Sequence, residues 1–280
     1  MKTTLSKKYI DRLAALNDQL CFFQFNRNEL NKRLSEFGTN AHSLFTPDVF
    51  AQNSMASRIN VTIGDLPRFQ ELNQTFTFGA YISTSYEVIS YYLRDSLDYL
   101  QSIEPLTFQL TNDRQLEEKY SLTLTSSGCS PIQRELIDTL KYIRLRRNHF
   151  THLADGLDPH FANLIATSGI TLNNFWAGTI IGLDFTSTNV LMFNESETID
   201  ILMLLRIIVE RLDAYLASNL SATGIITFIA DREFSSKPQR INNDVVKQRI
   251  SKVKTLGKKD FGIMLVESDI DPIVRVIGKR

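Results

Sequence analysis

Three of the four histidines in the chain lie within residues 140–160, and three arginines accompany them. The histidines are His149, His152 and His160, and the arginines are Arg144, Arg146 and Arg147. Histidine transfers protons near neutral pH, and arginine binds phosphate through two parallel hydrogen bonds. This segment therefore contains the residue types that acid–base chemistry on a phosphate ester requires.

We expect a helix over about residues 131–153 to position these side chains. Ser130, Pro131 and Gln133 fit an N-cap, a first helical residue and the closing residue of a capping box. One face is apolar at helical spacing, with Leu136, Leu140, Ile143 and Phe150. Arg147 falls on that face, where it needs an acidic partner or a water-filled cleft, because an unpaired buried charge is costly.

The six residues from Arg147 to His152 read Arg-Asn-x-x-x-His. This pattern resembles the signature of HEPN ribonucleases, in which an arginine, commonly followed by a polar residue, precedes a histidine. The resemblance implies an all-α bundle and a homodimer that cleaves RNA near the dimer cleft without metal or cofactor. It also implies a toxin or anti-phage defence effector with an antitoxin or inhibitor protein as a partner. It covers this motif and a helical arrangement over residues 76–218.

Other arginines and histidines in this segment have a similar spacing, but only Arg147 is followed by asparagine. We therefore assign the catalytic residues as Arg147, Asn148 and His152, with His149 and Arg144 as secondary candidates. Five positions on a regular helix separate Arg147 and His152 by roughly 140°. The two side chains meet at one phosphate either if the helix distorts near its end or if two chains combine.

In the reaction that the resemblance implies, the 2′-hydroxyl of the RNA attacks the adjacent phosphorus. The products carry 2′,3′-cyclic phosphate and 5′-hydroxyl ends. His152 would transfer protons, and Arg147 would hold the phosphate and stabilise the charge of the transition state. Asn148 would orient the histidine or the backbone.

Three other interpretations stay open. A HEPN-like module without catalysis would bind RNA or protein as a dimer. A metal-dependent hydrolase would take its ligands from the same segment, namely His149, His152, Asp155 and either Asp158 or His160. In a purely structural protein, Arg147 would form a buried ion pair.

The chain has 280 residues, 43% of them hydrophobic, and its 31 basic side chains balance 31 acidic ones. It is long enough for one large domain or two smaller ones, and any RNA contact must come from local patches. Cys21 and Cys129 make no disulfide framework and fit a reducing cytoplasm. The N-terminus lacks the apolar core of a signal peptide, and the most apolar run, residues 199–209, is too short and too charged to span a bilayer.

Hydrophobic periodicity predicts long helices over residues 6–37, 76–103 and 195–218. Gly38 is a natural stop for the first, and Asn194 begins a capping box ahead of the third. Residues 38–75 should form loops with short helices, and residues 105–130 a polar surface connection. Residues 161–193 stay undecided between strand and helix.

The predicted fold class is all-α: a HEPN-like helical bundle with an extra N-terminal helix over residues 1–220, followed by a small mixed, basic extension over residues 221–280. Eight lysines or arginines and one acid, Asp244, lie within residues 237–259. A short helix there carries Lys247, Arg249, Lys252 and Lys254. These side chains fit either salt-sensitive RNA contacts or a solvated helix face. Residues 263–277 are apolar and β-branched, which predicts a terminal strand or a docking segment.

Overall fold

The computed structural model describes residues 3–104, 115–126, 129–152, 156–190, 192–236 and 240–278. Within these ranges no strand forms, and Phe45 and Thr62 make an isolated antiparallel bridge. The expected all-α class is therefore confirmed. In the same ranges, no helix combines the length and the apolar character that crossing a membrane requires.

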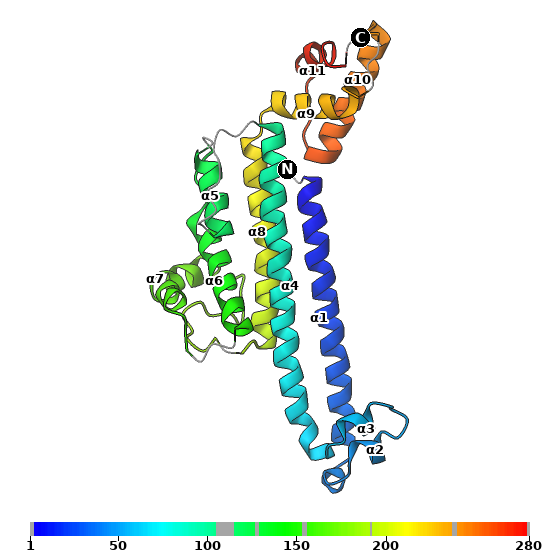
Figure 1. The fold of residues 1–280 in the computed structure, drawn as a ribbon, viewed down its shortest axis with the longest axis vertical. Helices are drawn as coiled ribbons and strands as arrows, with labels where there is room; N and C mark the ends of the chain where they lie inside the picture. Colours follow the sequence, from blue (N-terminus) through cyan, green and yellow to red (C-terminus); the bar gives the residue numbers. More distant parts are fainter. Residues whose placement is uncertain are drawn as a thin grey trace.

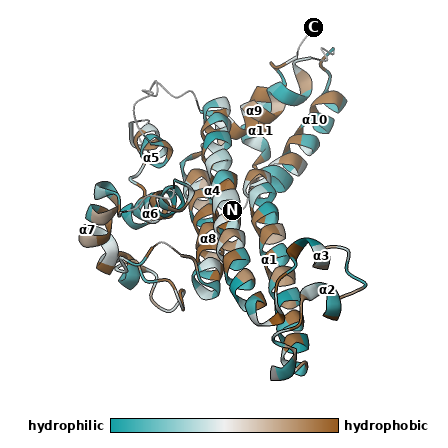
Figure 2. Cartoon of the chain, turned by 60° about the horizontal axis from the view of Figure 1, so that its bottom comes forward, coloured by the Kyte–Doolittle hydropathy of each residue, from teal (hydrophilic) through white to brown (hydrophobic). Residues whose placement is uncertain are grey.

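The body of the fold is built on α1 (Thr4–Glu36), α4 (Leu66–Ile103) and α8 (Glu195–Asn219). The three helices lie side by side, and α4 packs against both of the others (Figure 1). Hydrophobic residues dominate α8 (Figure 2), and its buried positions include Leu205 and Ile208. The predictions for α1 and α8 are confirmed. Helix α4 begins earlier than expected, because Pro67 fits the first turn of a helix, where its missing N–H costs nothing.

Two of the predicted helix boundaries have the expected chemistry. The side chain of Asn194 accepts the N–H of Glu197 at 2.8 Å, and Glu197 Oε2 accepts the N–H of Asn194 at 3.2 Å. At the end of α1, Gly38 adopts a left-handed conformation with φ of 66°, which an L side chain would strain. The capping box and the glycine stop are both confirmed.

A side layer of α5 (Leu116–Ser126), α6 (Arg134–Thr151) and α7 (Pro159–Phe175) lies on one side of α4 (Figure 1). The expected surface connection over residues 105–130 is wrong where α5 forms. Tyr120 and Leu124 lie one turn apart and are fully buried, so a short helix is stabilised in spite of its many Ser and Thr residues. Residues 105–114 and 127–128 lie outside the described residues.

The motif helix α6 begins at Arg134 with Gln133 as its N-cap, so the predicted start at Ser130 is wrong. The carbonyl of Ser130 accepts the hydroxyl of Tyr215 from α8, and Ile132 is buried. These contacts hold residues 129–133 in an irregular conformation.

After α7 ends at Phe175, the segment over residues 176–190 and 192–193 has no regular structure, so the described part of residues 161–193 is a helix followed by a loop. Asp200 of α8 anchors it by accepting three backbone N–H groups at 2.6–2.9 Å, from Ile181, Gly182 and Leu183. Trp176 is fully buried, and its indole N–H donates to Thr139 of α6 at 2.8 Å. The loop is thereby fixed against both α6 and α8.

The C-terminal part contains α9 (Ala222–Phe234), α10 (Asn243–Leu256), a π turn (Gly257–Phe261) and α11 (Glu267–Val274). These elements share a second hydrophobic core with Ile103 at the end of α4. Of the two alternatives predicted for residues 263–277, the terminal strand is wrong, because Ile270 and Val274 lie one helical turn apart in α11 and are both fully buried in this core.

We call residues 21–36 of α1 and 66–77 of α4 the stalk, which projects beyond the side layer and carries α2 (Thr46–Val49) and α3 (Ala56–Ile59) at its tip (Figure 1). In the stalk, the usual burial of apolar side chains and exposure of polar ones is reversed at several positions. Large apolar side chains are exposed, namely Phe22, Phe25, Phe69, Leu72 and Phe76. Gln24 is buried, and neither its amide nitrogen nor its amide oxygen has a hydrogen-bond partner among the described residues.

Candidate functional site

Three arginines within one turn of α6 have three different partners, because successive residues of a helix are about 100° apart. Arg144 contacts α5, Arg146 contacts α8, and Arg147 contacts α4. The helix is thus in contact with other elements on three sides, and each arginine has its own environment.

Arg146 is the core arginine of this helix, with a side chain that is 0% exposed. Its Nη2 donates to Glu197 Oε1 at 2.9 Å and to the carbonyl of Met192 at 3.2 Å, and its guanidinium lies 4.8 Å from the ring centre of Phe193. The expectation that Arg147 occupies the buried face is therefore wrong by one residue. Arg146 ties α6 to the capping box of α8 and is not accessible to a ligand.

Arg144, a secondary candidate, also has a structural partner. Its Nε donates to Glu117 Oε1 at 2.8 Å, and the side chain of Glu117 is fully buried. The hydroxyl of Tyr86 approaches the other oxygen of Glu117 at 3.4 Å. Burial, and then the charge of Glu117, hold the pKa of Tyr86 far above its ordinary value. Arg144 is therefore fixed in an ion pair between α5 and α6.

Arg147 lies in the seam between α6 and α4, and its side chain is 26% exposed. Its Nη2 donates to Glu87 Oε1 at 2.6 Å, its Nη1 donates to Asn148 Oδ1 at 3.1 Å, and its guanidinium lies 5.9 Å from the ring centre of Tyr86. Glu87 is 49% exposed, so solvent reaches this ion pair. Among the three arginines, Arg147 has the most exposed side chain and the most exposed acidic partner, although its Nε is buried and has no partner among the described residues.

The two remaining motif residues lie at the end of α6. Asn148 orients Arg147 through its side chain, while its carbonyl accepts the N–H of His152 at 2.9 Å. His152 is the exposed C-cap residue, with φ of −92° and ψ of 0°. Because α6 stays helical through Thr151, the helix does not distort between Arg147 and His152. Among the described residues, no hydrogen bond joins these two side chains.

His149, the other secondary candidate, is buried at 6% exposure, and its Nδ1 has no partner among the described residues. His149 and His152 therefore differ in environment, one inside the fold and one in solvent. Asp158 Oδ1 caps α7 by accepting the N–H groups of His160 and Phe161. Asp155 lies outside the described residues, and within the described part of the chain no group of three or more His, Cys, Asp or Glu side chains could hold a metal ion.

The basic C-terminal patch is smaller than its sequence indicates. Arg249 is buried, donates to the carbonyl of Val274 at 3.0 Å and lies over the ring of Phe234, so it is not a surface RNA contact. Lys252 pairs with Glu233 at 2.7 Å. Lys254 pairs with Glu267 at 2.8 Å. Lys247 is exposed and pairs with no acidic residue in the described ranges.

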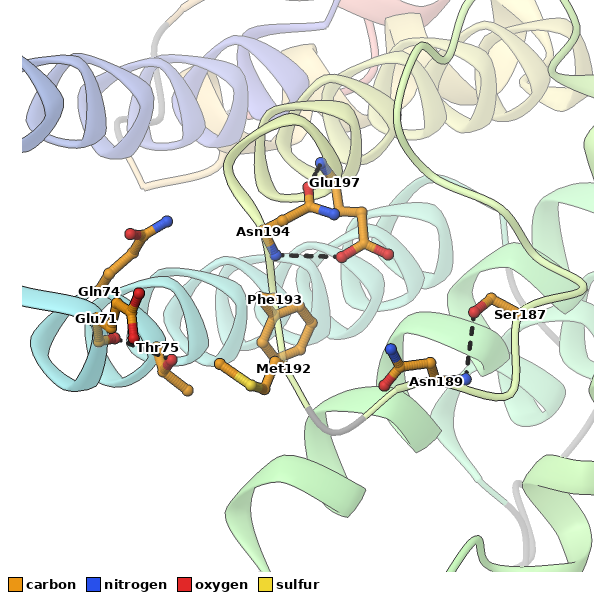
Figure 3. Close-up of a pocket in the computed structure, with 9 residues that line it drawn as sticks. All are labelled: Glu71, Gln74, Thr75, Ser187, Asn189, Met192, Phe193, Asn194 and Glu197. Atoms are coloured by element: carbon orange, nitrogen blue, oxygen red, sulfur yellow. Dashed lines mark hydrogen bonds between the residues drawn. The ribbon is translucent and has the colours of Figure 1, made fainter. Parts of the chain in front are cut away.

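A cavity of about 430 Å³ opens beside the end of α6, between α4 and the loop that precedes α8 (Figure 3). Its lining residues are Glu71, Gln74, Thr75, Ser187, Asn189, Met192, Phe193, Asn194 and Glu197. Phe150 of the motif contacts Phe193, one of the lining residues, with ring centres 5.6 Å apart, and its ring centre lies 6.5 Å from that of Phe76 on α4.

The sequence interpretation missed the cavity, Glu87 and Glu117. No local signal marks them, because they meet α6 only when distant helices pack together. The capping box of Asn194 and Glu197 is a local feature that the sequence does reveal, and both of its residues line the cavity.

Comparison with known proteins adds no assignment, since no family model, no curated protein and no solved structure matches this chain.

Proposed function

We propose that the chain is a metal-independent endoribonuclease of the HEPN type. The observation that carries the proposal is the contrast among the arginines of α6. Arg144 and Arg146 are fixed in ion pairs with poorly exposed acids, whereas Arg147 is 26% exposed, pairs with a half-exposed acid and lies on the same helix end as the exposed His152. Arg147 and His152 are also the pair that matches the Arg-Asn-x-x-x-His pattern.

The roles follow from the chemistry of these side chains. Arg147 binds the scissile phosphate and offsets the charge that develops on its oxygens. His152, which is exposed to solvent, transfers a proton to or from the attacking 2′-hydroxyl or the leaving 5′-oxygen. Asn148 holds the guanidinium of Arg147 in place through its Oδ1. A toxin or a defence effector would use such an activity against cellular or phage RNA.

A homodimer belongs to the same proposal. On a regular helix, Arg147 and His152 lie roughly 140° apart, so a complete site needs a second chain to supply one of them. An exposed apolar stripe on the stalk, formed by Phe69, Leu72 and Phe76, continues from Phe150 at the end of the motif. Burial of such a stripe is favourable, which supports a dimer cleft beside the motif.

One observation favours a second candidate, a HEPN-like module that binds RNA or protein without cleaving it. Glu87 neutralises Arg147 in this structure, so the phosphate site is already occupied by a carboxylate. A chain that never releases Arg147 would bind partners through the stalk alone.

A cleavage assay in EDTA tests the proposed function. Mixed RNA is incubated with the wild type, Arg147→Ala and His152→Ala, and product ends are analysed for 2′,3′-cyclic phosphate. Arg134→Ala is the matched control for the arginine, since Arg134 lies on the same helix and is 86% exposed. His160→Ala is the control for the histidine, since His160 is exposed on α7.

We expect the wild type and both controls to cleave RNA, and each motif variant to lose at least about a hundredfold in rate. Cleavage that survives both motif substitutions contradicts the proposal. Cleavage that appears only with added divalent metal favours a metal-dependent hydrolase instead. RNA binding without cleavage by the wild type and by every variant favours the non-catalytic module.

A further inference from the structure

The contact between Arg147 and Glu87 bears directly on how the proposed site works. Arg147 Nη2 donates to Glu87 Oε1 at 2.6 Å, across the seam between α6 and α4. Carboxylates and phosphates accept hydrogen bonds from a guanidinium in the same planar geometry. Glu87 therefore occupies the position on Arg147 that a phosphate of RNA would take.

The remaining contacts of Arg147 do not compete with a phosphate for Nη2. Asn148 accepts from Nη1 at 3.1 Å, and the ring of Tyr86 lies 5.9 Å from the guanidinium carbon. Tyr86 is buried and its hydroxyl approaches Glu117, so this ring is fixed in place. These contacts would keep the guanidinium oriented if Glu87 moved away.

Glu87 is the most exposed of the three acidic side chains that pair with these arginines. Its side chain is 49% exposed, and a solvent-exposed ion pair is weak and screened by salt. By contrast, Glu117 is fully buried against Arg144 and Glu197 is nearly buried against Arg146, so neither can exchange with an external anion in the same way.

We propose that Glu87 is an internal competitor for the phosphate site, which keeps Arg147 neutralised until a phosphodiester of RNA displaces it. This inference rests on the proposed function. A carboxylate tethered beside the arginine has a high effective concentration, so a small free anion displaces it poorly. RNA, which offers many phosphates along one strand, displaces Glu87 because contacts to neighbouring phosphates hold the strand in place.

Glu118 provides a matched control for this proposal. It lies on α5, is 38% exposed and pairs with Lys141 of α6 at 3.5 Å. Replacing either glutamate with glutamine removes one negative charge from an ion pair with α6. Only the change at Glu87 frees Arg147.

The test measures the binding of a fluorescent single-stranded oligonucleotide that carries 2′-O-methyl groups throughout, so that cleavage by 2′-hydroxyl attack is blocked. Fluorescence anisotropy at low, constant salt gives Kd for the wild type, Glu87→Gln, Glu118→Gln, Arg147→Ala and the double variant Glu87→Gln/Arg147→Ala. Far-UV circular dichroism of each protein verifies that it is folded.

We expect Glu87→Gln to lower Kd roughly fivefold, the upper end of what a solvent-exposed ion pair contributes, and Glu118→Gln to change it by less than about twofold. The gain should disappear in the double variant, because without Arg147 there is no site to release.

Four results overturn the proposal. Equal tightening by both glutamine variants would mean that only the overall charge matters, and tightening that persists in the double variant would mean that Arg147 is not involved. If Arg147→Ala weakens binding but Glu87→Gln leaves it unchanged, the competitor role fails while the proposed phosphate role stands. If Arg147→Ala has no effect on binding, the phosphate role fails as well.

Discussion

Replacing Arg146 with alanine should destabilise the fold strongly, whereas replacing its neighbour Arg147 should hardly change the stability. Arg146 is fully buried, and its removal leaves the carboxylate of Glu197, itself 9% exposed, without its positive partner. Removing one member of a buried ion pair costs about 3–5 kcal/mol. The pair between Arg147 and Glu87 is 26% and 49% exposed, and such a pair contributes only about 0–1 kcal/mol.

These free energies translate into separable melting temperatures. For chains of comparable size, 1 kcal/mol shifts Tm by about 2–4 °C. The alanine variant of Arg146 should therefore melt on the order of 10 °C below the wild type, and the Arg147 variant within about 4 °C of it. A double variant, Arg146→Met with Glu197→Gln, should recover part of the loss, because no unpaired charge is left inside the fold.

Thermal melting followed by the helical signal in far-UV circular dichroism measures these differences, and urea midpoints provide a second probe. Comparable losses for the two single variants would contradict the assignment of Arg146 to the core and Arg147 to the partly exposed seam between α6 and α4. An Arg146 variant as stable as the wild type would refute the inference that the pair with Glu197 is buried.

Two further predictions concern the packing around the motif and the buried tyrosines. Gly79→Ala places a Cβ 2.1 Å from the ring of Phe150, and this clash should lower the free energy of unfolding by about 1–3 kcal/mol. Because Phe150→Ala removes the ring, the effects of Gly79→Ala and Phe150→Ala on the free energy of unfolding should be non-additive. Additive losses would contradict the contact. Burial raises the pKa of Tyr92 and of Tyr120 well above the ordinary value. Because these pKa values are higher in the folded than in the unfolded protein, the protonated tyrosines stabilise the fold fully below the unfolded pKa of about 10, and this stabilisation decreases as the pH rises toward the folded pKa. Urea midpoints should therefore fall between about pH 9 and 11. Unchanged midpoints would argue against buried, protonated tyrosines.

Much of the fold could be predicted from the sequence, because local patterns determine it. The apolar spacing of α1 and α8, the capping box at Asn194 and the left-handed Gly38 act within a few residues of where they appear. The predictions are wrong where contacts between residues far apart in the sequence override local preferences. Residues 129–133 are irregular although they carry a capping-box sequence, because Tyr215 of α8 binds the carbonyl of Ser130.

The site could be predicted only in part, for the same reason. Sequence spacing selects Arg147, Asn148 and His152 as a group but cannot tell which arginine of α6 faces the core. That distinction depends on the direction from which α4, α5 and α8 approach, and an error of one residue rotates a side chain by about 100°. Glu87, which binds Arg147, is separated from it by 60 residues and carries no local signal.

Under the proposed function, packing favours one of the candidate pairs that sequence spacing leaves open. Three arginine–histidine pairs in this segment have nearly the same separation: Arg144 with His149, Arg146 with His152, and Arg147 with His152. The first pair combines an arginine held by Glu117 with a histidine inside the fold, and the second depends on an arginine inside the core. A phosphate could reach either arginine only by breaking an ion pair with a poorly exposed acid, at a cost of several kcal/mol. The third pair requires only the displacement of a half-exposed carboxylate, so the contacts that stabilise α6 also determine which of its arginines is available for chemistry.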